Sequence, residues 1–303
     1  MNTPSKPTRI TVPYRPVAIL VVLLTMMALM LPPGASARTN TKDKITVFLH
    51  GFNGQNCTGN WRELMLHMRA SGFTGPFYVV RFLSSDSQCD LSGIPNAVNA
   101  SLFDYGAHSG PYGHTGTTHD NNTDIRHLAW HFAHFLRLYI VEDPAVDVVG
   151  HSMGGLIVRY ALAKQTGDWP ALNIEDVVTL GTPHGGVNFA SWTGTLQGDQ
   201  MEPDSFFIGW LAQYAVNPQG SFGSEWTVLG SSGDVIVPRT TATNMGAAER
   251  VRYGLLPWPI GHGEYMHEDG TRNAGLWNGT QYQTYNTHGP MPMTRVALQH
   301  AGW

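Results

Sequence analysis

The segment of this sequence best suited to chemistry is Gly150–Gly155, which reads GHSMGG. An apolar, strand-like run precedes it, and the helix-like stretch Leu156–Leu162 follows at once. In the pattern Gly-x-Ser-x-Gly, this context places the serine on a strained strand-to-helix turn, with its hydroxyl beside the positive end of the helix. Gly150 and Gly154 are expected because a side chain at either position would collide with neighbouring backbone. We therefore predict that Ser152 is a nucleophile for acyl transfer.

Two further motifs accompany this segment: FLHGFNG at 48–54 and LGTPHGG at 180–186. With the three motifs in this order, the chain resembles the α/β-hydrolase superfamily, and within it the secreted bacterial lipases and esterases of the triacylglycerol lipase type, from about Ile45 to Met266. The resemblance implies an α/β fold with a mostly parallel sheet flanked by helices, and a Ser-His-Asp triad that works through an acyl-enzyme. It also implies an ester or lipid substrate, with no metal and no organic cofactor.

The resemblance further implies that the acid and the base follow the serine in the order Ser, acid, His. Asp234 lies in a Gly/Ser turn after the strand-like run Trp226–Leu229, where the superfamily places the acid. The competing acids fit less well, because Asp147 lies within a strand while Asp199 and Asp204 lie in an inserted segment. The simpler alternative for Asp234 is an ordinary turn residue that caps its own loop.

The base is expected in the loop after the last predicted strand, which contains both His262 and His267. His262 is favoured by its position in that loop, His267 is close enough to compete, and His288 is a weaker third choice. His151 and His184 precede the acid in the sequence, which breaks the expected order.

Acyl transfer also needs two backbone N–H donors directed at the developing oxyanion. The resemblance assigns one of them to Met153, the residue after the nucleophile. It assigns the other to Phe52, which follows the strand-like run Ile45–Leu49 and the turn at 50–51. The simpler alternative for this turn is a plain strand ending.

Short apolar runs alternate with longer helix-like stretches, which favours βαβ units and a parallel sheet. Only Arg38–Lys44 lies between a predicted leader, residues 1–37, and the first predicted strand. We therefore predict a reduced sheet of about six strands without an N-terminal antiparallel edge. The predicted strands are Ile45–Leu49, Phe77–Leu83, Val146–Val149, Val177–Leu180, Trp226–Leu229 and Val251–Leu255.

The clearest helix pattern spans Asp124–Tyr139, with one apolar face. Its opposite face carries three histidines at i, i+4 and i+7: His127, His131 and His134. This spacing can hold a metal, but no carboxylate shares the face. We therefore interpret it as a solvated polar face and predict no metal site.

Residues 187–225 stand where many enzymes of this type insert a cap or lid. Their aromatic side chains can line an acyl pocket, open against a lipid–water interface, or pack as a fixed cap.

The long irregular stretch Ser84–Asn122 is also predicted to be functional. The two cysteines of the chain, Cys57 and Cys89, predict a disulfide in an oxidising compartment, closing a loop of about 30 residues.

Residues 1–37 have the features of a secretory signal peptide. Lys6, Arg9 and Arg15 precede the apolar run Val17–Leu31, and small residues lead to Ala37. The alternative is an uncleaved membrane anchor, but the run is shorter than the ~20 residues of a spanning helix. We expect cleavage near Ala37, export to the outside of the cell without a stable membrane span, and a catalytic domain over residues 38–303.

After the leader, the chain carries 15 basic and 22 acidic side chains and has no basic run. An acidic surface repels phosphate backbones, so nucleic acid is excluded as the expected partner. The sequence predicts a secreted hydrolase of carboxylic esters that contacts a lipid–water interface transiently. Alternatives with the same triad are an acyltransferase, a phospholipase or a peptidase, and an alternative of another class is a secreted binding protein without turnover.

Overall fold

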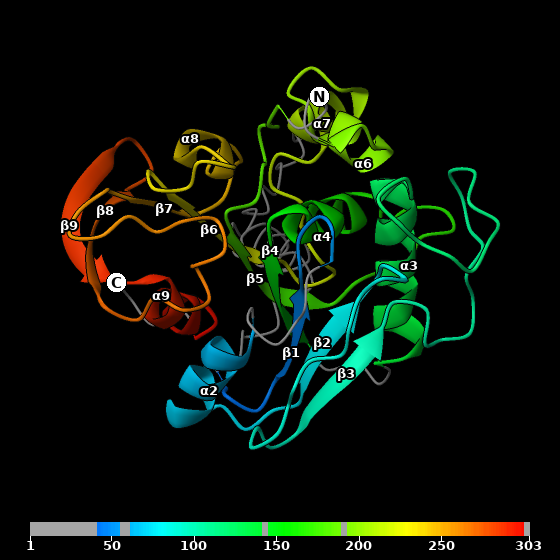
Figure 1. The fold of residues 1–303 in the computed structure, drawn as a ribbon, viewed down its shortest axis with the longest axis horizontal. Helices are drawn as coiled ribbons and strands as arrows, with labels where there is room; N and C mark the ends of the chain where they lie inside the picture. Colours follow the sequence, from blue (N-terminus) through cyan, green and yellow to red (C-terminus); the bar gives the residue numbers. More distant parts are fainter. Residues whose placement is uncertain (1–40, 55–60, 141–144, 189–192, 300–303) are drawn as a thin grey trace, which may run out of the picture. The chain divides into compact units, whose positions relative to one another are not determined.

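The computed structural model describes residues 41–54, 61–140, 145–188 and 193–299. These residues form one sheet with the strand order β3-β2-β1-β4-β5-β6-β7-β8-β9 (Figure 1). The strands β1 to β7 run parallel, whereas β8 and β9 are antiparallel to their neighbours. The bounds are β1 Ile45–Leu49, β2 Phe77–Arg81, β3 Ala97–Ser101, β4 Val146–His151, β5 Ile174–Leu180, β6 Glu225–Ser231, β7 Glu249–Tyr253, β8 Thr271–Trp277 and β9 Tyr282–His288.

The prediction of a mostly parallel α/β sheet is confirmed, but the number of about six strands is wrong, because the described residues form nine. All six predicted strands are present as β1, β2 and β4 to β7. Two of the three additional strands are the sheet edges, β3, which reads AVNAS, and β9, which reads YQTYNTH, and the third, β8, lies between β7 and β9. Edge strands need no continuous apolar run, because at least one of their faces meets water. Among the described residues, no strand precedes β1.

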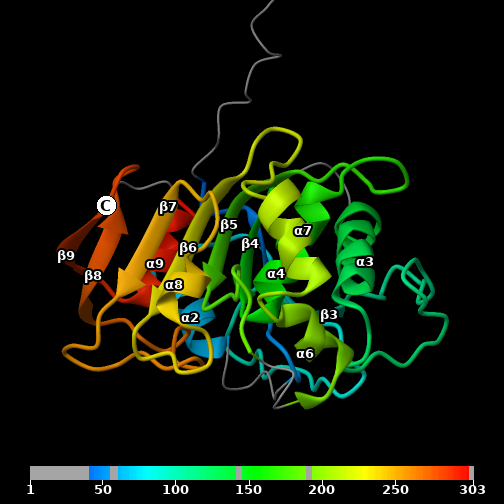
Figure 2. The ribbon, with the colours of Figure 1, turned by 90° about the horizontal axis from the view of Figure 1, so that it is seen from above.

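The helices cover both faces of the sheet, and the central strands are apolar because they are buried on both sides. Every residue of β4 and β5 is buried. One core lies between the sheet and α3 (Ile125–Leu138), α4 (Met153–Ala163) and α7 (Phe206–Tyr214). A second core lies on the opposite face, against α2 (Arg62–Ala70) and α9 (Pro290–Ala297). Figure 2 shows these two helices on the other side of the sheet from α4 and α7.

The histidine face of α3 is not solvated, so this part of the sequence interpretation is wrong. His127 and His131 are both fully buried, and the ring of His131 lies within hydrogen-bond distance of the Tyr105 hydroxyl, at 2.5 Å. Phe103, which precedes Tyr105 in the loop before α3, also packs on the His131 ring. The loop that leads into α3 therefore covers the face that the helical periodicity alone assigns to water.

The segment between β5 and β6 contains α6 (Leu196–Met201) and α7, where the cap was predicted. Its residues 189–192 lie outside the described part of the chain. The guanidinium of Arg159, on α4, is buried and donates hydrogen bonds to the backbone carbonyls of His184, Leu211 and Ala215. The segment between β5 and β6 is therefore attached to the helix that follows Ser152, and its role as a cap stays a prediction.

A buried charge cluster lies at the start of β1. The Lys44 ammonium nitrogen lies 2.8 Å from a Glu175 carboxylate oxygen and 3.6 Å from one oxygen each of Asp147 and Asp176. Three carboxylates around one cation leave a net negative charge if all are ionised. Burial, followed by the nearby Asp176 carboxylate, raises the pKa of Asp147 well above its usual range.

We expect Asp147→Asn to flatten the dependence of folding stability on pH. A carboxyl whose pKa is raised by folding holds its proton in the folded state, so its stabilising contribution is complete below the unfolded pKa and is lost as pH rises through the folded pKa. The largest slope for one group is about 1.4 kcal/mol per pH unit. Denaturant unfolding at several pH values measures this slope, and the exposed Asp199→Asn is the matched control. An unchanged slope in Asp147→Asn would contradict the prediction.

The predicted signal peptide and the predicted partner of Cys89 fall on residues that the structure does not describe, namely 1–37 and Cys57. The disulfide therefore stays a prediction, and we expect thiol titration of the unreduced, unfolded protein to find no reactive thiol. Two reactive thiols would contradict it. Within the described ranges, none of the helices has the length and apolar character that crossing a membrane requires.

Candidate active site

Ser152 occupies a sharp turn between β4 and α4. Its backbone dihedrals are φ 53° and ψ −129°, a region that L-residues other than glycine rarely adopt. The strain is held in place by the Ser152 N–H, which donates to the Leu180 carbonyl at 2.9 Å, and by the Gly155 N–H, which donates to the Ser152 carbonyl at 3.1 Å. The predicted strained turn is therefore confirmed, and strain of this kind is typical of functional residues.

The glycines on either side of Ser152 have the predicted steric reason. A Cβ at Gly150 would lie 2.8 Å from the Cα of Gly155 on the first turn of α4. A Cβ at Gly154 would lie 2.5 Å from the carbonyl oxygens of both Leu49 and His50. Both contacts are with backbone, which cannot rotate away as a side chain can.

We expect Gly154→Ala to destabilise the fold by about 1–3 kcal/mol, because the methyl group meets the end of β1. Gly209→Ala is the control: Gly209 lies on α7 with nothing within 4 Å of an added Cβ, and alanine is favoured over glycine in a helix by about 1 kcal/mol. Thermal unfolding of the two variants measures the difference. Equal midpoints for both would contradict the steric argument.

Ser152, His262 and Asp234 form a continuous hydrogen-bonded chain. The Nε2 atom of His262 lies 2.9 Å from the Ser152 Oγ atom, and its Nδ1 atom lies 2.8 Å from an Asp234 carboxylate oxygen. Because a carboxylate only accepts, Nδ1 carries the proton and Nε2 accepts from the serine hydroxyl. Ser152 and Asp234 are buried, whereas the His262 side chain is 18% exposed.

The Asp234 carboxylate has further donors, which fix its orientation. Its Oδ1 atom accepts from the backbone N–H groups of Ile236 and Val237, at 2.9 and 2.8 Å. Its Oδ2 atom, which faces His262, also accepts from the Tyr265 hydroxyl at 3.2 Å. Burial raises the pKa of Tyr265 well above its usual range, so this hydroxyl keeps its proton and donates. The sequence analysis did not identify Tyr265 as a partner of the acid.

The other histidines that the sequence offers have different partners. His267 lies 2.9 Å from the Glu63 carboxylate on α2 and takes no part in the chain of hydrogen bonds at Ser152. His151 Nε2 donates to the His262 carbonyl at 2.7 Å, and burial lowers the pKa of His151 to about 3. His151 is therefore a neutral support for the His262 loop. His184 bonds to the Thr179 hydroxyl, and His288 belongs to β9.

The turn after β1 lies directly against the nucleophile. A Cβ at Gly51 would lie 2.6 Å from the Cβ and 3.1 Å from the Oγ of Ser152. Phe52, the next residue, packs on the core. Met153 is the first residue of α4, where backbone N–H groups have no acceptor within the helix. The two segments predicted to supply oxyanion donors are therefore adjacent to Ser152, and the donor roles themselves stay predictions.

A second histidine–aspartate pair supports this turn. His50 Nε2 lies 2.7 Å from an Asp86 carboxylate oxygen, which also accepts from the N–H groups of Phe82 and Leu83. The His50 ring stacks on Phe82 with 3.9 Å between the ring centroids. Burial alone would raise the pKa of Asp86, but the His50 contact and the backbone donors outweigh it and lower the pKa. Sequence reasoning missed Asp86, which ties the turn to the end of β2.

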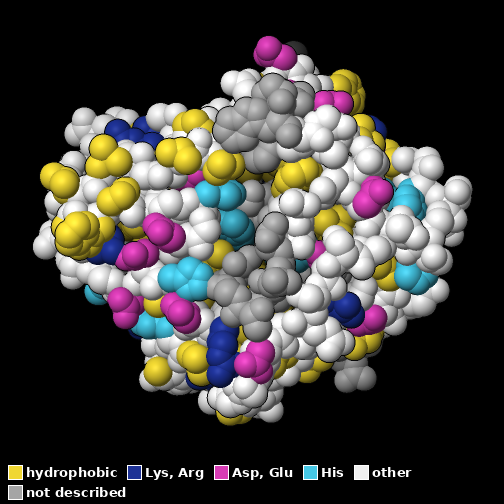
Figure 3. All heavy atoms as spheres, viewed as in Figure 1, with side chains coloured by type: hydrophobic (Ala, Val, Ile, Leu, Met, Phe, Trp, Pro, Cys, Tyr) yellow, Lys and Arg dark blue, Asp and Glu magenta, His cyan; other side chains and the backbone are white. Residues whose placement is uncertain are grey.

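The loops that carry Asp234 and His262 also present exposed apolar side chains. These are Val235, Leu255, Leu256 and Trp258, each more than half exposed. Figure 3 shows apolar side chains gathered on the left of this face, over segments that follow β6, with histidine side chains near its middle. A water-exposed group of this kind is typical of a surface that meets an apolar partner.

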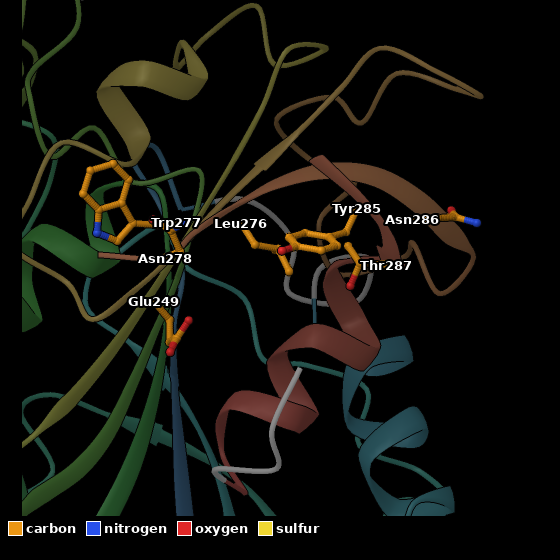
Figure 4. Close-up of a pocket in the computed structure, with 7 residues that line it drawn as sticks. All are labelled: Glu249, Leu276, Trp277, Asn278, Tyr285, Asn286 and Thr287. Atoms are coloured by element: carbon orange, nitrogen blue, oxygen red, sulfur yellow. The ribbon is translucent and has the colours of Figure 1, made fainter. Parts of the chain in front are cut away.

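A cavity of about 510 Å³ lies elsewhere, beside the β8–β9 hairpin. Figure 4 shows its lining from β7, β8 and β9, including Glu249, Leu276 and Tyr285. None of the three hydrogen-bonded residues Ser152, His262 and Asp234 lines it. We therefore do not assign this cavity to the candidate active site.

Residues 120–193, which span α3, β4, the Ser152 turn and α4, match the family model of the PGAP1-like alpha/beta domain. No curated protein sequence matches the chain.

Similar solved structures include the phospholipase PlaB from Legionella pneumophila in complex with thio-NAD, at 16% identity and a TM-score of 0.44, covering 66% of this chain and 43% of that one. The lipase BlEst2 from Bacillus licheniformis is 16% identical, with a TM-score of 0.39 and coverages of 65% and 69%. The alpha/beta hydrolase domain-containing protein 10 from mouse is 13% identical, with a TM-score of 0.39 and coverages of 74% and 83%. This chain therefore spans less than half the length of the phospholipase.

The family match, the parallel strand order and the strained serine between β4 and α4 lead to one assignment. The described residues have a fold of the α/β-hydrolase type, and residues 120–193 are similar to the PGAP1-like alpha/beta domain.

Proposed function

We propose that the protein is an exported serine hydrolase that cleaves carboxylic esters, with lipid-like esters as its substrate class. The observation that carries this proposal is the hydrogen-bonded chain from Ser152 through His262 to Asp234. A buried serine on a strained turn, in contact with an oriented imidazole, is the arrangement of an activated nucleophile.

In the proposed reaction, Ser152 Oγ attacks the ester carbonyl carbon while His262 Nε2 takes the hydroxyl proton. The carbonyl oxygen becomes an oxyanion, which the N–H groups of Met153 and Phe52 stabilise. The intermediate collapses when His262 returns the proton to the leaving alcohol, and an acyl-serine remains. Water then repeats the cycle on the acyl-enzyme, with the same imidazole as base and acid, and releases the carboxylic acid.

Support for an apolar substrate comes from the loops around the site. Val235 is 84% exposed and Trp258 is 70% exposed, and they lie on the loops that carry the acid and the base. Apolar side chains of this kind can lie against the acyl chains of a lipid aggregate, where each buried CH₂ contributes about 0.8 kcal/mol. This supports a transient contact with a lipid–water interface.

The test is hydrolysis of p-nitrophenyl esters from acetate to palmitate by the protein without residues 1–37 and by its Ser152→Ala variant. We expect the variant to lose about 10⁶-fold in turnover, while circular dichroism and thermal unfolding stay unchanged. An optimum at long chains supports a lipase-like enzyme, and an optimum at short chains an esterase. Equal rates for the two proteins, or no hydrolysis of any ester by the folded protein, would overturn the proposal.

A further inference from the structure

Three histidines outside the candidate active site bring their ring nitrogens together. They are His114 and His119, in the loop before α3, and His127 on α3. One ring nitrogen from each lies within 4.8 Å of the others. His119 and His127 are buried and His114 is partly exposed. We call this group the histidine cluster. Figures 1 and 2 show the loop that precedes α3 running beside that helix.

Backbone carbonyls fix the protonation of two of these rings. His127 Nδ1 donates to the Pro111 carbonyl at 2.9 Å, which leaves Nε2 with a free lone pair. His114 Nε2 donates to the Gly116 carbonyl at 2.9 Å, which leaves Nδ1 in the same state. Histidines that bind metals almost always donate their other ring N–H to a carbonyl or carboxylate in this way.

The spacing between two of the rings suits a shared cation better than a hydrogen bond. The Nε2 atoms of His119 and His127 lie 3.4 Å apart. That separation is longer than ordinary N–H hydrogen bonds, which extend to about 3.2 Å. Two nitrogen ligands of a tetrahedral zinc ion, each at about 2.0–2.1 Å from the metal, lie about 3.3 Å from each other.

A further nitrogen borders the cluster. His131 is fully buried, its ring lies 4.4 Å from that of His127 between centroids, and its Nε2 atom has no hydrogen-bond partner among the described residues. A cation shared by buried imidazole nitrogens that face one another would satisfy their lone pairs.

We propose that His114, His119 and His127 bind one Zn²⁺ ion, with His131 or water as the fourth ligand. Imidazole ligands favour zinc over calcium and magnesium, which prefer oxygen. The bound ion would fasten the loop before α3 to the helix. The Ser84 hydroxyl and N–H bond to the N–H and carbonyl of His119, so the fastened loop reaches back toward the end of β2. None of the residues proposed for ester hydrolysis belongs to the cluster.

The test is titration of tag-free, chelator-treated protein with Co²⁺ and Zn²⁺. We expect one Co²⁺ per chain, with the visible absorption bands of tetrahedral cobalt, displaced by one equivalent of Zn²⁺. Losing a residue that merely supports a metal ligand typically lowers metal affinity by about 10–100-fold. Because His114→Ala removes a ligand itself, we expect its loss of affinity to be at least as large. His119→Gln should behave likewise. His114→Ala is the decisive variant, because its ring is partly exposed and its loss is the less disruptive to the fold.

Two control variants distinguish binding at the histidine cluster from binding at other histidines and from the proposed ester hydrolysis. His267→Ala removes a histidine outside the cluster and should bind metal as the wild type does. Ser152→Ala should also bind metal normally, because ester hydrolysis and metal binding are independent. In thermal unfolding, Zn²⁺ should raise the midpoint of the wild type and not of His114→Ala. Absence of stoichiometric binding, or equal binding by wild type and His114→Ala, would overturn the zinc site and leave the proposed hydrolase intact.

Discussion

Replacing His262 by alanine is expected to lower kcat for ester hydrolysis by about 10⁶-fold, as losing the base of a serine triad does in other enzymes. The reason is local: His262 Nε2 lies 2.9 Å from the Ser152 hydroxyl, and without it that hydroxyl has no base to take its proton. The kcat of the variant is measured with a p-nitrophenyl ester at saturating concentration. An unfolding curve of the same protein shows whether it is folded.

His267→Ala is the matched control for this prediction. His267 follows His262 in the same loop, yet it pairs with Glu63 at 2.9 Å and its side chain is 30% exposed. Exposed ion pairs contribute about 0–1 kcal/mol to stability, so this variant should keep both its fold and its activity. If His267→Ala were inactive and His262→Ala active, the assignment of the base would be wrong.

The second large effect is expected for Asp234→Asn, which should lower kcat by about 10⁴-fold while the geometry stays intact. The Oδ1 atom of Asp234 accepts from the N–H groups of Ile236 and Val237, so the amide oxygen of asparagine must take that place. The amide NH₂ then faces His262 Nδ1 and can only donate to it. The proton moves to Nε2, and this tautomer cannot accept the proton of Ser152.

Two further variants serve as comparisons for the kcat of Asp234→Asn. Asp199→Asn, on α6, removes an exposed carboxylate and should leave kcat unchanged. Tyr265→Phe removes one donor to Asp234 and should cost about 1 kcal/mol, or roughly fivefold in rate. Steady-state kinetics of the three proteins gives the order. A near-normal kcat for Asp234→Asn would contradict the orienting role of the carboxylate.

The serine turn was predictable because its requirements are local. Gly150, Ser152 and Gly154 lie within five residues, and the strain and close approaches arise between β4, α4 and the end of β1. The order of acid and base along the chain was likewise enough to select Asp234 as the candidate acid, and the structure brings its carboxylate to His262. It was not enough to separate His262 from His267, because both lie in one loop. That choice depends on Asp234 and on His151, which are distant in sequence and hold the His262 ring and carbonyl.

Contacts that join distant segments were beyond the sequence pattern. Asp86 reaches His50 across 36 positions, and Tyr265 reaches Asp234 across 31, with no spacing rule that links either pair. The same holds for the buried face of α3. Its helical period predicts one apolar face, but only the path of the preceding loop decides that His127 and His131 are also covered.

Under the proposed function, the attachment of α7 to Arg159 affects how an ester would reach Ser152. The guanidinium holds the carbonyls of Leu211 and Ala215 at the end of α7, and burial lowers the pKa of Arg159 to about 10, so it stays charged near neutral pH. Each hydrogen bond to a charged group contributes about 1.5–3 kcal/mol, so a conformation that breaks even one is populated less by a factor of ten or more. We therefore expect the C-terminal end of α7 to keep its position relative to α4. Admission of the substrate would then depend on movement of segments that Arg159 does not hold, such as the exposed loop around Leu256 and Trp258.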